Sequence, residues 1–420
     1  MAESNQGGRR RILTAAAVGL LVLFAVYLIA NIALRPDRYQ WDFRVYYYAA
    51  RGYPVGVDPY NPQEIQKFAP SCPLLPFVYP PPILTAFRLL AELPYDVAYY
   101  VWLGLKVLAL IGLIFIWRRY LFRDAAPLPM VLILLLGFSG TIYMDLMTGN
   151  ISILEQFLLW SGIVLLLRGR LLAFSALVIL AASFKLTPAV FLLLLVFSPS
   201  PRRWRFLVGS VAASVGLLAL SYFADPSLFM RFVDAAWRID ERGTDGNPSL
   251  LALIRDLGEQ VFPASAMPWA QPGLFLLYGA AVIAILWVSI RSWRRLRTVS
   301  AGDADLATLH LFCVTYALVM PRFKTYSFIM LLPAAFYALK RNAHLAAFPF
   351  LLALFALLLH PPLPTRPPTQ LLVEVLWLYH PLLLAFLLWG LLLHSVSRSH
   401  AAYLTAQTVG GGDVSGARGS

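Results

Sequence analysis

The sequence predicts an all-α polytopic membrane protein. Hydrophobic residues make up 60% of the 420 residues and charged residues only 13%, and the mean hydropathy is +0.70. A soluble domain of this length needs a far more polar surface. A transmembrane β-barrel would show short alternating segments in place of the long, unbroken apolar runs of this chain.

The net charge of +13 reflects short basic clusters that separate the apolar runs. Clusters of this kind mark the cytoplasmic ends of membrane helices and set their orientation, so nucleic acid is not an expected partner. They are Arg9-Arg10-Arg11, Arg118-Arg119, Arg168 with Arg170, Arg202-Arg203 with Arg205, Arg291 with Arg294-Arg295 and Arg297, and Lys340-Arg341.

Placing every basic cluster on the cytoplasmic side predicts roughly twelve membrane crossings, with both termini cytoplasmic. Arg170 and Arg202 flank one apolar run, so this run is expected to form two short helices that turn at Lys185-Leu186-Thr187-Pro188. The predicted crossings are Ile12–Leu34, Ala98–Trp117, Leu128–Met144, Ile151–Leu167, Leu171–Phe184, Pro188–Phe197, Phe206–Phe223, Leu274–Ile290, Leu306–Val319, Tyr326–Leu339, Leu345–Leu359 and Leu371–Leu393.

Two segments are too long to be simple turns, and both map to the extracytoplasmic face. They cover residues 35–97 and 224–271 and include the amphipathic stretches Ile83–Leu93 and Ser227–Trp237, which suit short interfacial helices. We expect residues 1–400 to form one transmembrane domain. Residues 401–420 are Gly-rich and lack a periodic pattern, which predicts a disordered cytoplasmic tail.

Several polar features are expected to converge on the outer face. Asp42 stands just beyond the first apolar run, among aromatic and basic residues. The other features lie in the outer segments and turns: Arg44, Asp58-Pro59-Tyr60-Asn61-Pro62, Phe77-Val78-Tyr79-Pro80-Pro81-Pro82, Asp145 with Thr148-Gly149-Asn150, Ser183-Phe184-Lys185-Leu186-Thr187-Pro188, and Pro321-Arg322-Phe323-Lys324-Thr325-Tyr326.

A carboxylate with several cations at a membrane surface suits a phosphorylated lipid substrate. Arg and Lys side chains neutralise the phosphate, and a carboxylate accepts the proton of an attacking hydroxyl. Acidic side chains also bind divalent metals, so a metal stays an alternative, although no cofactor is expected and the histidines lack metal-ligand spacing. The sequence has no Gly-rich phosphate loop after a strand, which disfavours a nucleotide-sugar donor on a Rossmann domain.

The order of these features resembles glycosyltransferase family 87, within the GT-C superfamily of polytopic membrane enzymes. The matching pieces extend from the first apolar run to about Pro333. They are Asp42-Phe43-Arg44-Val45-Tyr46, Asp58-Pro59-Tyr60, Phe77-Val78-Tyr79-Pro80-Pro81, Gly149-Asn150 and Lys185-Leu186-Thr187-Pro188.

The resemblance implies a GT-C-like fold and assigns a role to Asp42, which matches the aspartate that serves as the family's catalytic base. Some members carry a histidine near the donor in a late outer turn, which corresponds here to Pro321–Pro333. Tyr326 and Ser327 occupy that neighbourhood in this chain, after Arg322 and Lys324. This departure from the family pattern bears on which acceptor the protein uses and on whether it is a mycobacterial-type mannosyltransferase.

Each candidate residue also has a structural interpretation. Asp42 can pair with Arg44 or Arg38. The Asp-Pro-Tyr-Asn-Pro motif favours a turn role for Asp58, which is otherwise a second candidate base. Asn150 suits a helix N-cap and Tyr79 an aromatic belt, with sugar contact as the alternative. The cations Lys185, Arg322 and Lys324 either extend toward the interface or bind phosphate.

The expected function is that of an inverting hexosyltransferase. By resemblance, it moves a sugar, with mannose the leading choice, from a polyprenyl-phosphate donor to a lipid or glycan acceptor. The expected site contains Asp42 as general base and Arg44, Asp58, Tyr79, Asn150, Lys185, Arg322, Lys324 and Tyr326 as binding residues. We expect it on the extracytoplasmic face of a multi-pass protein of the cell membrane. The alternatives are a flippase or transporter of lipid-linked sugars and a non-catalytic subunit of cell-envelope assembly.

Overall fold

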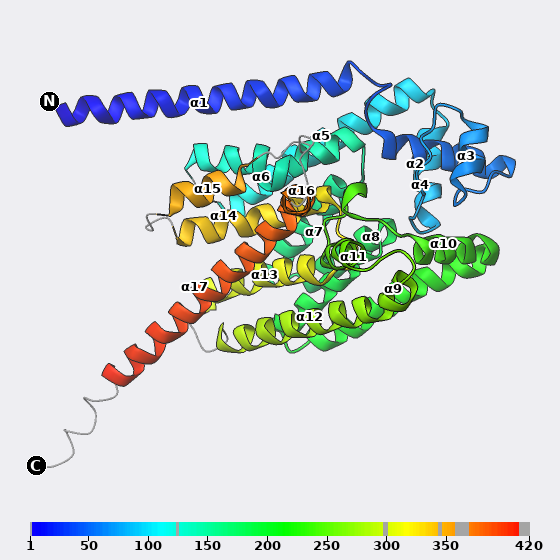
Figure 1. Cartoon of the computed structure of the whole chain (residues 1–420). Helices are drawn as coiled ribbons and strands as arrows, with labels where there is room; N and C mark the ends of the chain where they lie inside the picture. The colour runs from blue at the N-terminus through cyan, green and yellow to red at the C-terminus, as the bar shows by residue number, and fades with distance from the viewer. Residues whose placement is uncertain (1, 123–125, 297–300, 343–346, 358–368, 411–420) are drawn as a thin grey trace, which may run out of the picture. The chain divides into compact units, whose positions relative to one another are not determined.

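A computed structural model describes the chain except for residues 1, 123–125, 297–300, 343–346, 358–368 and 411–420. The elements of the described residues are all helical, as the sequence predicts (Figure 1). Contacts between Cα atoms divide the chain into two compact units. Unit 1 contains Met1–Val131 and Ile142–Asp240, and unit 2 contains Leu132–Thr141 and Glu241–Ser420. The sequence predicted one domain over residues 1–400.

Unit 1 packs its helices mainly against neighbours in the sequence. Helix α7 lies against α5 and α8, while α2 lies against α4. The elements are α1 (Ala2–Ala33), α2 (Trp41–Gly52), η1 (Tyr53–Val55), α3 (Pro62–Phe68), α4 (Pro82–Ala91), α5 (Tyr95–Tyr120), the two ends of α6 (Pro127–Thr148), α7 (Ser152–Leu167), α8 (Leu171–Phe184), η2 (Thr187–Phe197), α9 (Arg203–Ala224) and α10 (Pro226–Arg238).

Unit 2 contains the middle of α6 and the later helices. Helices α12, α13 and α17 pack against one another. The elements are η3 (Gly243–Asp245), α11 (Leu250–Val261), α12 (Met267–Leu296), α13 (Ala301–Val319), η4 (Thr325–Leu331), α14 (Leu332–Arg341), α15 (Phe348–Phe355), α16 (Thr369–Leu378) and α17 (His380–Gly410).

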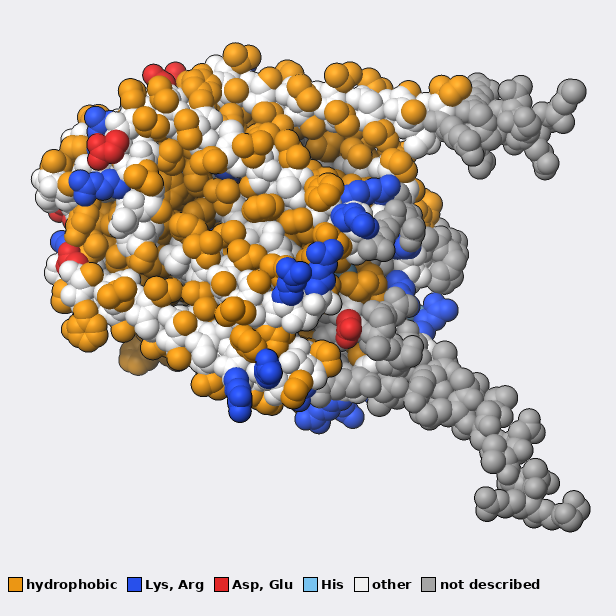
Figure 2. Space-filling view, turned by 180° about the vertical axis from the view of Figure 1, so that it is seen from behind, with side chains coloured by type: hydrophobic (Ala, Val, Ile, Leu, Met, Phe, Trp, Pro, Cys, Tyr) orange, Lys and Arg blue, Asp and Glu red, His pale blue; other side chains and the backbone are white. Residues whose placement is uncertain are grey.

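Six helices are long and apolar enough to cross a membrane, within the described residues. They contain Ile12–Ala33, Tyr95–Tyr120, Pro127–Thr148, Arg203–Ala224, Met267–Leu296 and His380–Arg398. Four other predicted crossings correspond to shorter apolar helices, in α7, α8, η2 and α13. The predicted crossing Tyr326–Leu339 is divided between η4 and α14, and both ends of Leu345–Leu359 lie outside the described residues. Figure 2 shows a face on which hydrophobic side chains predominate and acidic ones are few. The chain is therefore a multi-pass membrane protein of the predicted class.

Local details follow the sequence in most places and differ in two. The predicted interfacial stretches form α4 and α10, and the apolar run before Ser198 breaks after Phe184, with Lys185 extended. The predicted crossing Leu371–Leu393 is divided at Tyr379, because Pro381 begins a new helix. Helix α17 continues to Gly410, through the first half of the predicted tail.

Candidate active site

Asp42 lies in the first turn of α2, in unit 1. The helix begins after Gln40, whose φ of 56° places it in the left-handed region. The Gln40 amide donates to the carbonyl of Met147 at 2.7 Å, which ties the start of α2 to the end of α6. A carboxylate in a first turn is stabilised by the N-terminal end of the helix dipole. The backbone therefore favours the ionised form of Asp42.

The side chain of Asn150 connects Asp42 to two tyrosines. Its Nδ2 lies 2.7 Å from Asp42 Oδ2 and 2.9 Å from the hydroxyls of Tyr46 and Tyr79, which are 2.6 Å from each other. Its Oδ1 accepts hydrogen bonds from the backbone N and the Oγ of Ser152, at 3.2 and 2.9 Å. Because these two donors fix the amide oxygen, the Asn150 nitrogen must face the carboxylate.

Asn150 is not the N-cap of α7, as one interpretation predicted, because Ile151 occupies that position and Asn150 precedes it. Its oxygen binds an N–H at the start of α7, and its nitrogen holds Asp42. The amide has two hydrogens for three oxygen neighbours, so Tyr46 and Tyr79 complete the network by bonding to each other. Tyr79 is buried in this cluster, so Asn150 joins two of the predicted site residues, Asp42 and Tyr79.

The position of Asn150 depends on the tight turn before it. Gly149 has a φ of 75° and ends α6. A Cβ at Gly149 would lie 2.8 Å from the Cβ and 2.9 Å from the Cα of Gln40. The Trp102 indole N–H donates to the Gly149 carbonyl at 2.9 Å. Only glycine fits this backbone without strain.

Next to this turn lies a buried ion pair that joins two predicted spans. Lys106 Nζ of α5 is 2.8 Å from Asp145 Oδ1 of α6, and both side chains are fully buried. The charge of Asp42 acts on both groups. Lys106 was not among the predicted site residues, although a lysine inside an apolar run is itself a signal of function.

Lys185, the predicted phosphate ligand of unit 1, has a carboxylate partner. Its Nζ lies 3.4 Å from Glu155 Oε2, and Glu155 is buried in the first turn of α7. Glu155 falls within a predicted crossing and was not among the predicted site residues. As for Lys106, a charged residue within an apolar segment was the sequence feature that could have identified Glu155.

Arg44 and Asp58 hold the outer segment of unit 1 together. Arg44 donates to the carbonyls of Pro36 and Ser71 at 2.8 and 3.1 Å and to the Tyr95 hydroxyl at 3.1 Å. Asp58 Oδ1 accepts from the Tyr60 amide at 3.0 Å, which is the turn geometry that Asp-Pro-Tyr-Asn-Pro favours. These contacts give both residues a structural role.

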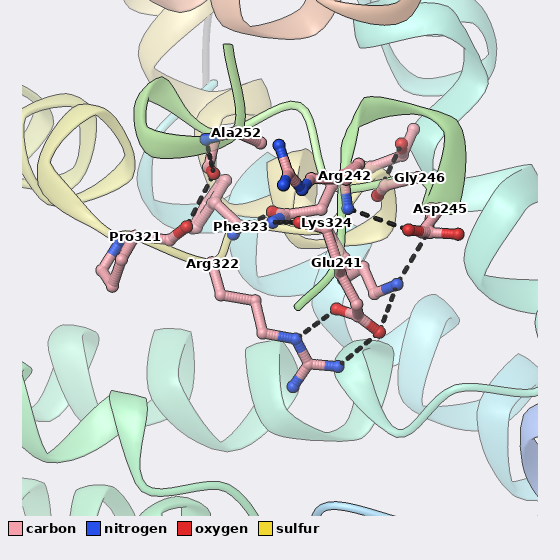
Figure 3. A network of polar contacts seen from close by, with 12 residues as sticks. Glu241, Arg242, Asp245, Gly246, Ala252, Pro321, Arg322, Phe323 and Lys324 are labelled. Atoms are coloured by element: carbon pink, nitrogen blue, oxygen red, sulfur yellow. Dashed lines mark hydrogen bonds and ion pairs between the residues drawn. The ribbon is translucent and has the colours of Figure 1, made fainter. Parts of the chain in front are cut away.

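In unit 2, Arg322 and Lys324 share the carboxylate of Glu241 (Figure 3). Arg322 binds both carboxylate oxygens, with Nη2 3.0 Å from Oε1, and Lys324 Nζ lies 2.8 Å from Oε1. Burial by itself would raise the pKa of Glu241, but the Arg322 and Lys324 charges outweigh it and lower that pKa. Tyr326 is buried in η4.

The described residues contain no group of three His, Cys, Asp or Glu side chains arranged to hold a metal ion. The predicted site residues instead lie in separate polar clusters of the two units. Unit 1 brings together Asp42, Tyr79 and Asn150, and unit 2 holds Arg322 and Lys324. Paired carboxylates and cations of this kind suit proton transfer and phosphate binding.

Comparison with known proteins identifies the family. The model of glycosyltransferase family 87 matches residues 77–321, which is more than half of the chain. The matched region contains Tyr79, Asn150 and Lys185, while Asp42 precedes it. No curated protein and no solved structure matches. The chain belongs to glycosyltransferase family 87 and is a membrane glycosyltransferase, which acts on a sugar donor and a glycan or lipid acceptor.

Proposed function

We propose that this member of glycosyltransferase family 87 is an inverting hexosyltransferase with Asp42 as its general base. The donor is a polyprenyl-phosphate sugar, for which mannose is the leading choice by family resemblance, and the acceptor is a lipid or glycan hydroxyl. The proposal rests above all on the 2.7 Å hydrogen bond from Asn150 to Asp42. A charge-assisted bond of this kind keeps a carboxylate ionised and oriented.

The proposed reaction is a single displacement. Asp42 takes the proton from the acceptor hydroxyl, whose oxygen attacks the anomeric carbon as the bond to the phosphate oxygen breaks. The phosphate leaves with the electron pair of that bond, and the configuration at the anomeric carbon inverts. Lys185 is the candidate of unit 1 to neutralise the leaving phosphate, and Arg322 with Lys324 is the separate candidate of unit 2. Either would make a separate general acid unnecessary.

The remaining candidate residues support this site in the proposal. Tyr79 and Asn150 position the base, and Arg44 and Asp58 hold the segment that carries it. Tyr326 belongs to the turn of Arg322 and Lys324, where it contributes packing. No cofactor is needed for the displacement.

We place the site on the extracytoplasmic face of the cell membrane, with both termini in the cytoplasm. The support is the asymmetric distribution of arginine. Arg9-Arg10-Arg11 lie in the N-terminal part of α1, and Arg118-Arg119 lie in the last turn of α5. Asp42 lies between these two helices in the chain, toward the opposite end of each.

The test begins with cells that lack the gene. Mass spectrometry of their envelope glycolipids and glycans identifies the missing sugar, and hence the donor and acceptor. Wild-type protein and Asp37→Asn should restore the product, because Asp37 is an exposed carboxylate in the same segment whose backbone alone contacts Arg44. Asp42→Asn, which removes the basic oxygen but keeps the shape, should not.

A second assay separates transfer from translocation. Purified protein in detergent micelles is given polyprenyl-phosphate [³H]mannose and a lipid extract of the host membrane. Labelled product shows an enzyme, because micelles offer no second leaflet for a flippase or transporter. Full activity of Asp42→Asn in either assay would remove Asp42 from the mechanism, and a lack of product with every sugar found missing in cells would favour a non-catalytic subunit.

A further inference from the structure

The Lys106–Asp145 ion pair is unusual in its setting. Both side chains are completely buried, and each belongs to a helix that is long and apolar enough to span a membrane. Burying two charges in such a place is costly, and an apolar pair would pack there at lower cost. Retaining the pair therefore requires a reason beyond stability.

The hydrogen bonds of Lys106 lead to the proposed base. Besides the Asp145 carboxylate, Nζ donates to the Asp145 backbone carbonyl. The same carbonyl accepts from the Gly149 amide at 3.0 Å and from Thr148 Oγ1 at 3.2 Å, and Thr148 Oγ1 in turn accepts from the Asn150 amide at 3.2 Å. One lysine thus fixes the carbonyl around which the turn carrying Asn150 is built.

The two charges of this pair act on Asp42 with opposite sign. Lys106 and Asp145 both interact electrostatically with Asp42 and together carry no net charge. The titratable hydroxyls in its network are those of Tyr46, on its own helix, and Tyr79, before α4.

Other charged groups on the elements packed against α2 are engaged elsewhere. Arg44 donates to loop carbonyls, and Glu64 of α3 accepts from the Asp58 amide. Arg88 of α4 is exposed and pairs with the exposed Glu92, and Asp96 of α5 is also exposed. Solvent screens the charges of these exposed groups.

We propose that Lys106 and Asp145 are positioning residues for the base: the lysine fixes the turn that aims the Asn150 amide at Asp42, and the aspartate cancels the charge this lysine brings. This inference rests on the proposed role of Asp42. It requires that the two members of the pair act on Asp42 with opposite sign, whereas an ion pair that does not influence Asp42 would leave its protonation unchanged.

The test measures the protonation of Asp42 in single variants of the pair. Dicyclohexylcarbodiimide reacts with protonated carboxyl groups, and peptide mass spectrometry reports the pH at which half of Asp42 is modified. Asp145→Asn leaves the Lys106 charge beside Asp42 and should move this midpoint down by roughly 1 pH unit, while Lys106→Met leaves a carboxylate and should move it up by about as much. The acid limb of the pH profile of kcat/KM should shift in the same directions.

Two control variants complete the design. Lys106→Met/Asp145→Leu removes both charges and should bring the midpoint back toward that of the wild type, although loss of the fixed turn lowers transfer. The double variant can also be measured if a single variant fails to fold, because replacing both members of a buried ion pair destabilises a protein less than replacing one. Arg88→Met removes one positive charge from an element that packs on α2, but at an exposed site, and should leave the midpoint unchanged.

The two proposals fail in different ways. If Asp42→Asn retains transfer, Asp42 is not the base, whatever the labelling shows. If Asp42→Asn is inactive but Lys106→Met and Asp145→Asn move the midpoint in the same direction, or not at all, the positioning role of the pair is wrong. Opposite shifts with recovery in the double variant would support it.

Discussion

Replacing Asn150 by alanine removes the donor that holds the proposed base and leaves the backbone turn in place. Asn150 Nδ2 lies 2.7 Å from Asp42 Oδ2, and the side chain is fully buried. After the change, Asp42 loses an oriented N–H, and Tyr46 and Tyr79 keep their mutual hydrogen bond. The substitution therefore tests orientation of the carboxylate more than integrity of the fold.

The magnitude follows from the type of bond. A hydrogen bond to a charged group contributes roughly 1.5–3 kcal/mol. If most of this energy is used to hold Asp42 ionised and aligned, its loss lowers kcat/KM by about 10- to 100-fold, at about 1.4 kcal/mol for each factor of ten. The same loss destabilises the ionised form and raises the pKa of Asp42 by up to about 1–2 units. The acid limb of the pH profile then moves to higher pH.

The assay is sugar transfer in detergent micelles, measured from low to neutral pH, with Ser152→Ala as a graded control. Ser152 Oγ donates to Asn150 Oδ1 at 2.9 Å, while its backbone N–H stays in place. Loss of this neutral bond, of about 0.5–1.5 kcal/mol, should lower kcat/KM only by about 2- to 10-fold. A folded Asn150→Ala with the kcat/KM and acid limb of the wild type would refute the reasoning.

Two further changes have clear expectations. Gly149→Ala should destabilise the protein by about 1–3 kcal/mol, measured by thermal unfolding in detergent, because of its φ of 75° and the contact with Gln40, and should abolish transfer. Glu241→Gln leaves Arg322 and Lys324 without their shared carboxylate and should lower the KM for the donor. The pKa of folded Glu241 is depressed from 4.5, so its stabilising effect is present above that pH and is lost as the pH falls through the folded pKa; acid should destabilise Glu241→Gln less than wild type.

The sequence predicted features that local rules determine. Apolar runs and basic clusters indicated the membrane class, and amphipathic periodicity located α4 and α10. A break at Lys185 followed from the orientation of two arginine clusters. Asp42 stood out because a carboxylate directly after a span is rare.

The contacts that the sequence did not predict are between residues that lie far apart in the chain. Lys106 and Asp145 are 39 residues apart, and Glu241 and Arg322 are 81 residues apart. Without an alignment of related sequences, no spacing rule connects such pairs. Each charge was nevertheless visible, and a charge within or beside an apolar segment requires a partner. The sequence could have predicted that partners exist, though not which residues they are.

The cations that we propose as ligands of the donor phosphate share one property, which bears on rate as well as on affinity. Lys185 is paired with Glu155, and Arg322 and Lys324 are paired with Glu241. A phosphate that binds in either unit therefore competes with a carboxylate. This competition weakens binding of the intact donor, whose phosphodiester carries one negative charge. Phosphate charge increases as the sugar leaves, so the cations stabilise the transition state more than the donor, and only this difference raises kcat. Glu241→Gln should therefore lower KM without raising kcat.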